Sequence, residues 1–259
     1  MSGLNVNQSP ESRESLHLAE EAKQGNLRAI ARLISLLENQ DQAGISALHS
    51  LNGTGRQVTV IGITGYPGAG KSTLIDQLVR IYRRQGKKVG IIAIDPSSPK
   101  TGGALLGDRI RMHDHARDPN VFIRSMATRG YHGGLARTTG ETVAALRATG
   151  FQVILLETVG VGQGEVDVAE VADMVVAVVT PGLGDEVQAL KAGLLEIADI
   201  VVVNKRDLPG ADAAVKYLQE WVGHVIPTNA ITGEGVEEVA AAIAELERTA
   251  RPTSATEMK

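Results

Sequence analysis

The sequence lacks cysteine altogether and contains few aromatic residues. Without cysteine, the chain can form no disulfide, no thiolate metal site and no cysteine nucleophile. Because aromatic residues make up only 3% of the 259 residues, a buried core has to consist mainly of Val, Ile, Leu and Ala. With 43% hydrophobic residues, the chain can still build a substantial core.

Long apolar stretches and blocks of like charge are also missing. The longest apolar runs are too short to cross a bilayer, and the amino terminus, MSGLNVNQSP, is polar where a secretory peptide needs an apolar segment. The formal net charge is −4, and the sequence has no run of five or more like charges that would indicate a nucleic-acid tail or polybasic anchor. We therefore expect a cytoplasmic protein with neither nucleic-acid nor membrane partners.

The first fifty residues have helical signals. Ser9-Pro10 is typical of a cap and first turn, Gly25 of a helix end, and Asn26 of the next cap. One helical face then carries Leu27, Ile30, Leu33, Ile34 and Leu37. This apolar stripe predicts packing on the rest of the chain, and a partner-binding face is the alternative.

From residue 57 onward, apolar β-branched runs alternate with amphipathic stretches. Strands are predicted at 58–64, 89–95, 121–125, 153–158, 174–180, 200–205 and 224–227. Helices are predicted near 71–85, 134–149, 185–197, 211–222 and 234–249. Buried strands joined by helical crossovers indicate an α/β fold with a doubly wound, mostly parallel sheet.

The stretch GYPGAGKS, residues 65–72, matches G-x-x-x-x-G-K-[ST] between a predicted strand and a predicted helix. Backbone N–H groups of such a loop surround a phosphate at a helix amino terminus. Gly68 and Gly70 permit the close approach, Lys71 can bridge the outer phosphates, and the Ser72 hydroxyl can ligate Mg²⁺. The pattern predicts a phosphate site formed by Gly65, Gly68, Ala69, Gly70, Lys71, Ser72 and Thr73.

A second motif selects the base. Asn204-Lys205-Arg206-Asp207 matches N-K-x-D at the end of a predicted strand. The Asp207 carboxylate can accept hydrogen bonds from guanine N1–H and the 2-amino group, whereas against ATP it would be left buried and unpaired. The segment PTNAITGEG follows, and Asn229-Ala230 takes the place of a base-contacting Ser-Ala pair, with the Ala230 N–H as the expected contact. These residues favour a guanine nucleotide.

Carboxylates at strand ends suggest a metal site. Glu157 ends a strand in LLETVGVG, where enzymes with this phosphate loop place the acid that supports Mg²⁺, and Gly160 can offer its N–H to the γ-phosphate. Asp95 ends another strand, and Asp108 lies in the Ser-, Pro- and Gly-rich loop after it. Either aspartate could instead cap a loop.

Five segments in order, TGYPGAGKST, IDPSSPKTGGALLGD, ETVGVGQGE, PGLGDEVQALK and VVNKRD, resemble the MeaB/ArgK family of P-loop GTPases, the chaperones of adenosylcobalamin-dependent acyl-CoA mutases. The resemblance covers residues 56–210. It implies a P-loop GTPase domain at 56–250 between a helical extension at 1–55 and a polar tail at 251–259. It also implies metal ligands, namely Ser72, Asp95, Asp108 and Glu157, and candidate catalytic residues, namely Lys71, Asp95 and Gln163.

By the same resemblance, GTP hydrolysis gates cobalamin transfer into a mutase, which is contacted through switch loops at 95–111, 157–169 and 181–191. Val161 follows Gly160 where small GTPases place a water-orienting Gln, so we expect slow hydrolysis that a partner accelerates, with Gln163 as a candidate after rearrangement. Relatives usually continue into a dimerisation arm that is short here, so any homodimer would form differently.

Three other readings remain open. A nickel-type metal-insertion GTPase would share the fold, but the missing cysteines argue against it. A small-molecule kinase is disfavoured by N-K-x-D, and a scaffold that binds nucleotide without turnover is the third alternative. His113 and His115 have the spacing of metal ligands, but a pair of this kind is more often found at a helix end.

Overall fold

The computed structural model describes residues 10–51, 58–95, 115, 117–127, 134–158, 164–182 and 193–250. The chain begins with three helices, α1 (Pro10–Lys23), α2 (Leu27–Glu38) and α3 (Gln42–Leu51). Strands and helices then alternate: β1 (Thr59–Gly65), α4 (Lys71–Arg84), β2 (Val89–Asp95), β3 (Val121–Ala127), α5 (Gly134–Ala148), β4 (Val153–Thr158), α6 (Gly164–Val171), β5 (Met174–Val179), α8 (Leu194–Ile197), β6 (Ile200–Val203), α9 (Ala211–Leu218), β7 (His224–Pro227) and α10 (Val236–Ala250).

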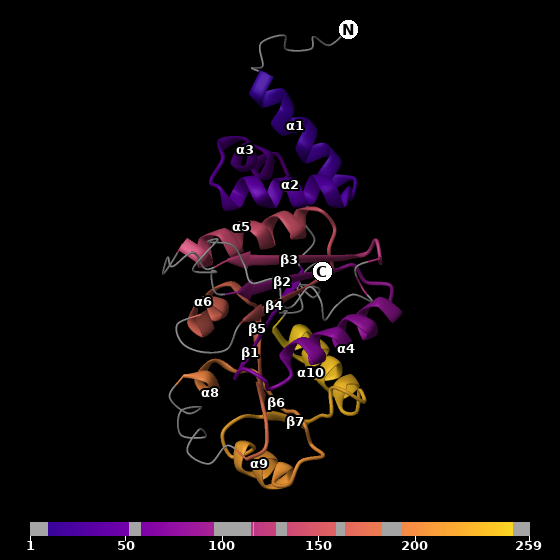
Figure 1. The fold of residues 1–259 in the computed structure, drawn as a ribbon, viewed down its shortest axis with the longest axis vertical. Coiled ribbons are helices and arrows are strands. Elements are labelled where there is room, and N and C mark those ends of the chain that lie inside the picture. The colour runs from indigo at the N-terminus through magenta and orange to yellow at the C-terminus, as the bar shows by residue number, and fades with distance from the viewer. Residues whose placement is uncertain are drawn as a thin grey trace, which may run out of the picture.

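The seven strands form one sheet in the order β3-β2-β4-β1-β5-β6-β7, and every neighbouring pair is parallel. Helices α4 and α10 cover one face, while α5, α6, α8 and α9 cover the other (Figure 1). The predicted α/β class with a doubly wound parallel sheet is confirmed. Since β1 lies between β4 and β5, the carboxyl ends of these three strands converge at one edge, where ligands bind in open α/β sheets.

The strands are apolar along their length because both faces of the sheet are covered. All six residues of β4 and of β5 are buried, as are all four of β6. Side chains of β1 alternate between the two layers: Ile61 and Ile63 pack toward α4 and α10, while Val60 packs toward α5 and α6. This packing explains why continuous Val- and Ile-rich runs identified the strands in the sequence.

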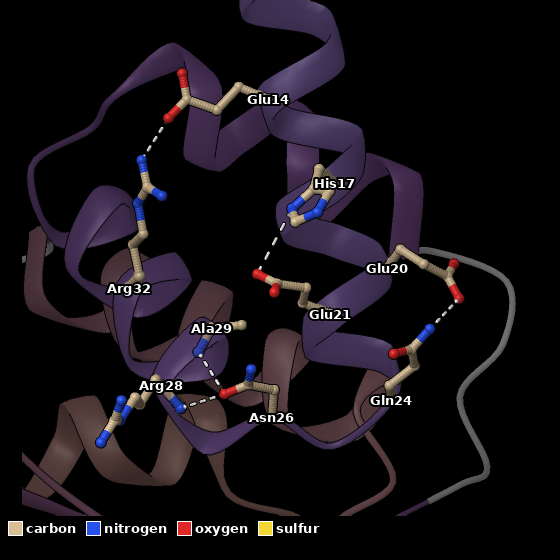
Figure 2. Close-up of polar contacts among 9 residues, drawn as sticks. All are labelled: Glu14, His17, Glu20, Glu21, Gln24, Asn26, Arg28, Ala29 and Arg32. Carbon is tan, nitrogen blue, oxygen red and sulfur yellow. Dashed lines mark hydrogen bonds and ion pairs between the residues drawn. The ribbon is translucent and has the colours of Figure 1, made fainter.

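The amino-terminal helices pack on the α5 side of the sheet (Figure 1). Four residues of the predicted stripe on α2 are buried in the same apolar cluster as residues of β2, β4 and α5, and Leu27 is partly buried against that cluster, so the expected packing on the rest of the chain is confirmed. Asn26 caps α2: its side-chain oxygen accepts from the N–H groups of Arg28 and Ala29 at 3.0 and 3.3 Å (Figure 2). An ion pair between Arg32 and Glu14 joins α2 to α1 (Figure 2).

Candidate functional site

The predicted phosphate loop connects β1 to the first turn of α4. Gly70, directly before α4, has φ 98°, and a Cβ on it would lie 2.2 Å from the Asn204 Nδ2 atom. Gly68 has φ 78°, and a Cβ there would meet nothing within 4 Å. Gly70 is therefore fixed both by its backbone conformation and by a close approach, whereas Gly68 faces open space. A helix of 14 residues begins here, so its free N–H groups and dipole favour an anion.

Lys71 and Ser72 occupy the first turn of α4. Lys71 is only 7% exposed, and its Nζ donates to the carbonyl oxygens of Gly65 and Tyr66 at 2.8 and 3.1 Å. The Ser72 hydroxyl donates to Glu157 Oε1 at 2.6 Å. Glu157, which is 5% exposed, lies on β4 opposite Ile63 of β1, so the sheet register brings it to the phosphate loop. The hydroxyl and carboxylate supply the hard oxygen donors that Mg²⁺ prefers, so these residues fit a Mg²⁺ ion.

Asn204 connects the phosphate loop to the loops after β6 and β7. Its side chain is 3% exposed, and its Nδ2 donates to the Ala69 carbonyl at 2.8 Å. Its Oδ1 accepts from the Thr228 hydroxyl at 3.1 Å and from the Ala230 N–H at 3.0 Å. The Ala230 N–H, expected from the sequence to contact the base, is therefore engaged by Asn204. The side chain of Asn204 holds three segments together at the carboxyl edge of the sheet.

Asp207 lies at the surface end of this arrangement. Its Oδ1 accepts from Asn229 Nδ2 at 3.0 Å, while Asn229 Oδ1 accepts from the N–H groups of Ile231 and Thr232 at 3.1 and 3.3 Å. The two backbone bonds orient the Asn229 amide so that its nitrogen faces the carboxylate. Lys205, between Asn204 and Asp207 in the chain, has φ 58°, a left-handed conformation that is uncommon outside glycine and often marks a binding site.

One cavity of about 500 Å³ joins these parts, and a ligand site for a small molecule commonly has this size. It brings together most of the sequence-predicted residues, namely Gly68, Gly70, Lys71, Ser72, Thr73, Glu157, Asn204, Lys205, Asp207, Asn229 and Ala230. Pro67, Thr158, Leu208 and Ile231 also line it and were not predicted. Thr158 directly follows Glu157, and the two aliphatic side chains carry no chemical signature in a single sequence.

Several predicted residues are not among those that line the cavity. Gly65 and Ala69 contribute the carbonyl groups that bind Lys71 and Asn204. Asp95 is the last residue of β2, beside β4, and nothing is described of its side chain. Asp108, Gly160 and Gln163 lie outside the described residues.

A second polar group joins α4 to the segment before β3. His115 is buried with its Nε2 2.9 Å from Asp76 Oδ1, and Arg83 Nε donates to Asp118 Oδ2 at 2.8 Å. The Arg83 hydrogen bond lowers the pKa of Asp118 below its usual value. His113 lies outside the described residues. Within the described ranges, no group of three or more His, Cys, Asp or Glu side chains is placed so that it could hold a metal ion.

Helix length and composition bear on membrane insertion. Across the described parts of the chain, no helix is both long enough and apolar enough to pass through a bilayer.

Comparison with known proteins gives one family match. The profile of the family described as "Methylmalonyl Co-A mutase-associated GTPase MeaB" matches residues 30–259. A protein of Pyrococcus horikoshii whose name refers to a GTPase is 52% identical over 238 residues, which are 86% of this chain and 74% of that protein. The mouse protein named "Methylmalonic aciduria type A homolog, mitochondrial" is 40% identical over 204 residues, which are 73% of this chain and 49% of that protein.

A solved structure shares the architecture. The crystal structure of a protein titled "LAO/AO transport system kinase" superposes with a TM-score of 0.72 and 26% sequence identity. The match covers 95% of this chain and 77% of that one. The similarity extends over nearly all of the chain and includes the parallel sheet.

Proposed function

The chain belongs to the MeaB family of methylmalonyl-CoA mutase-associated GTPases, and we propose that it binds and hydrolyses GTP to gate adenosylcobalamin delivery to a B12-dependent acyl-CoA mutase. The observation that carries this proposal is the single cavity that contains both Lys71 and Asp207. One end offers a buried ammonium group and a helix amino terminus for phosphates. The other end offers a carboxylate for the edge of a base. A nucleoside triphosphate is the ligand that needs both ends together.

At the phosphate end, Lys71 is the group that would move on binding. In this structure its ammonium is bound to two loop carbonyls, and a triphosphate offers it stronger, charged acceptors. Ser72 and Glu157 would hold Mg²⁺, which when bound neutralises charge on the phosphates. Asp95 and Asp108 remain proposed members of this metal group.

At the base end, Asp207 supports a preference for guanine. Its carboxylate can accept from N1–H and the 2-amino group of guanine, and adenine has no donor at these positions. Asn229 holds one carboxylate oxygen through its Nδ2, so the carboxylate is already oriented before the base arrives. Pre-orientation reduces the entropy that binding has to overcome.

Hydrolysis is proposed to be slow without a partner. Among the described residues that line the cavity, none is a glutamine or histidine able to orient water, and Gln163, which lies outside the described residues, remains the candidate. We propose that the mutase supplies or rearranges the missing group through the switch loops, including 181–191. GTP then acts as a timer, because the loops relax once the γ-phosphate leaves.

Phosphate release by the purified protein tests this proposal. GTP and ATP would be compared with and without methylmalonyl-CoA, isobutyryl-CoA or 2-hydroxyisobutyryl-CoA mutase, and Lys71→Ala would serve as the inactive control. We expect slow turnover of GTP, little of ATP, and a clear increase with one mutase. Failure of every mutase to bind or to change the rate would leave a GTPase without the chaperone role.

The same assay separates the kinase alternative. The related structure is titled a transport system kinase, so phosphate transfer to a small acceptor has to be measured alongside release to water. An ATP preference with transfer to a small acceptor would contradict the GTPase proposal. Full activity in Lys71→Ala would contradict the assignment of the phosphate loop.

A further inference from the structure

A buried contact between a histidine and a carboxylate lies outside the cavity and has no part in the proposed function. His115 is 8% exposed, and its Nε2 lies 2.9 Å from Asp76 Oδ1. The two side chains make no directed hydrogen bond in this arrangement, so charge is the main attraction between them. Because histidine changes its charge between pH 5 and 8, the strength of this contact depends on whether His115 carries a proton.

Asp76 stands on the same helix as the phosphate loop. It follows Ser72 by four residues in α4, so the two side chains share one face and are separated by about 6 Å along the helix axis. Ser72 lines the cavity and donates to Glu157 there. His115 therefore lies about 10 Å from the amino end of α4, where the proposed phosphates bind. At this separation two charges still interact, because it is close to the screening length of physiological salt.

Two carboxylates and two arginines surround His115. From α4 it faces Asp76, whose Oδ2 accepts from Arg80 Nε at 3.0 Å. From its own segment it faces Asp118, whose Oδ2 accepts from Arg83 Nε at 2.8 Å. The Arg83 hydrogen bond is the main cause of the lowered pKa of Asp118, and the charge of His115 acts in the same direction. The arginines balance the carboxylates, so the group is neutral with neutral His115 and carries one positive charge when His115 is protonated.

We propose that protonation of His115 strengthens nucleotide binding, because it gives the group behind the phosphate loop one positive charge. The inference rests on the proposed nucleotide site and adds to it a dependence on pH. Binding and protonation favour each other by linkage, so the protein should take up protons when the nucleotide binds. One charge about 10 Å from the phosphates corresponds to about a fivefold change in affinity. His115 does not touch the nucleotide and acts through the field of its charge.

The test measures GDP dissociation constants by calorimetry at pH 6 and pH 8 for wild-type protein and His115→Gln, which keeps a neutral donor facing Asp76. His17→Gln is the matched control, because His17 also lies beside a carboxylate, Glu21 at 3.6 Å, but is 75% exposed (Figure 2). GDP itself titrates, so the readout is the ratio of variant to wild-type constants at each pH. His115→Gln should bind about fivefold more weakly than wild type at pH 6 and equally at pH 8. His17→Gln should match wild type at both.

Two further measurements do not depend on the folding of His115→Gln. Calorimetry of wild-type protein at pH 6.5 in two buffers of different ionisation enthalpy should show proton uptake beyond that of free GDP with Mg²⁺. Asp76→Asn adds one unit of positive charge without a histidine proton, so it should bind GDP about fivefold more tightly than wild type at pH 8.

Three results would overturn the role of His115. The first is an equal loss of affinity in His115→Gln at both pH values, which would indicate packing alone. The second is wild-type affinity of this variant at both, and the third is weaker binding by Asp76→Asn at pH 8. If wild-type protein binds no GDP at either pH, the proposed function itself fails, which distinguishes the two failures.

Discussion

Replacing Asn204 by alanine should destabilise the protein strongly, although the substitution removes only one small side-chain amide. The substitution removes the partners of the Ala69 carbonyl, the Ala230 N–H and the Thr228 hydroxyl, all in a region where Asn204 is 3% exposed. Each buried polar group left without a partner costs about 1–3 kcal/mol, and the hydroxyl least because it can rotate, so we expect a loss of about 4 kcal/mol. At about 2–4 °C per kcal/mol for a chain of this size, the unfolding temperature should fall by about 10 °C.

The assay is thermal and urea unfolding of the nucleotide-free protein, followed by circular dichroism. Asn229→Ala is the matched control, since it deletes the same amide from the same cavity. Its partners, Asp207 and the N–H groups of Ile231 and Thr232, remain accessible to water, so the loss should stay below about 1 kcal/mol. Equal destabilisation by the two substitutions would refute the reasoning that Asn204 connects three buried segments.

Two further predictions concern single carboxylates. Asp207→Asn should weaken GTP and favour xanthosine triphosphate, whose 2-carbonyl can accept from the new amide; nucleotide competition measures this, and an unchanged preference for guanine would contradict the base assignment. Asp118→Asn should reduce stability at neutral pH, because the hydrogen bond from Arg83 lowers the pKa of Asp118 in the folded state. A carboxyl group whose pKa is lower in the folded state adds stability above its unfolded pKa, and this added stability is lost as the pH falls through the folded pKa. The urea unfolding curves of wild-type and variant protein should therefore converge below about pH 4. A constant difference between the curves there would contradict this linkage.

Much of the fold is predictable because the strands are buried on both faces. All seven predicted strands are present and begin within one residue of their predicted starts. The strand predicted at 200–205 extends two residues past the end of β6, because Asn204 and Lys205 lie beyond the sheet and line the cavity. Asn204 and Lys205 are polar residues that line the cavity, so they fall outside the apolar pattern that marks the strand.

Other elements had weak signals. Helix α6, Gly164–Val171, was not predicted, because most of the apolar residues in GEVDVAEV are valines, which have low helix propensity, and the segment follows a glycine-rich motif. Of the helix predicted at 185–197, the described part shows α8, Leu194–Ile197, while residues 183–192 lie outside the described ranges.

The site was predictable where chemistry limits the residue type. The fixed spacing of G-x-x-x-x-G-K-[ST] predicted Lys71 and Ser72 as site residues, and the fixed spacing of N-K-x-D predicted Asp207. The orientation of Asn229 by two backbone N–H groups was not predictable, because it depends on how the turn before α10 folds. Ile231 was missed for a different reason, since an aliphatic residue in a sequence suggests burial and here it is 82% exposed.

The parallel sheet sets an order for assembly of the site. No neighbouring pair in the described sheet is antiparallel, so none can be closed by a two-residue hairpin, and folding should be slow. Strand β1, which leads into the phosphate loop, pairs with β4 and β5, whose register partners Val153 and Met174 lie about a hundred residues further along the chain. Asn204, which fastens that loop, comes later still. A nascent chain emerging from the ribosome should therefore be unable to retain nucleotide until Asn204 and the loop after β7 have been made, and nucleotide capture would report that synthesis has passed this point.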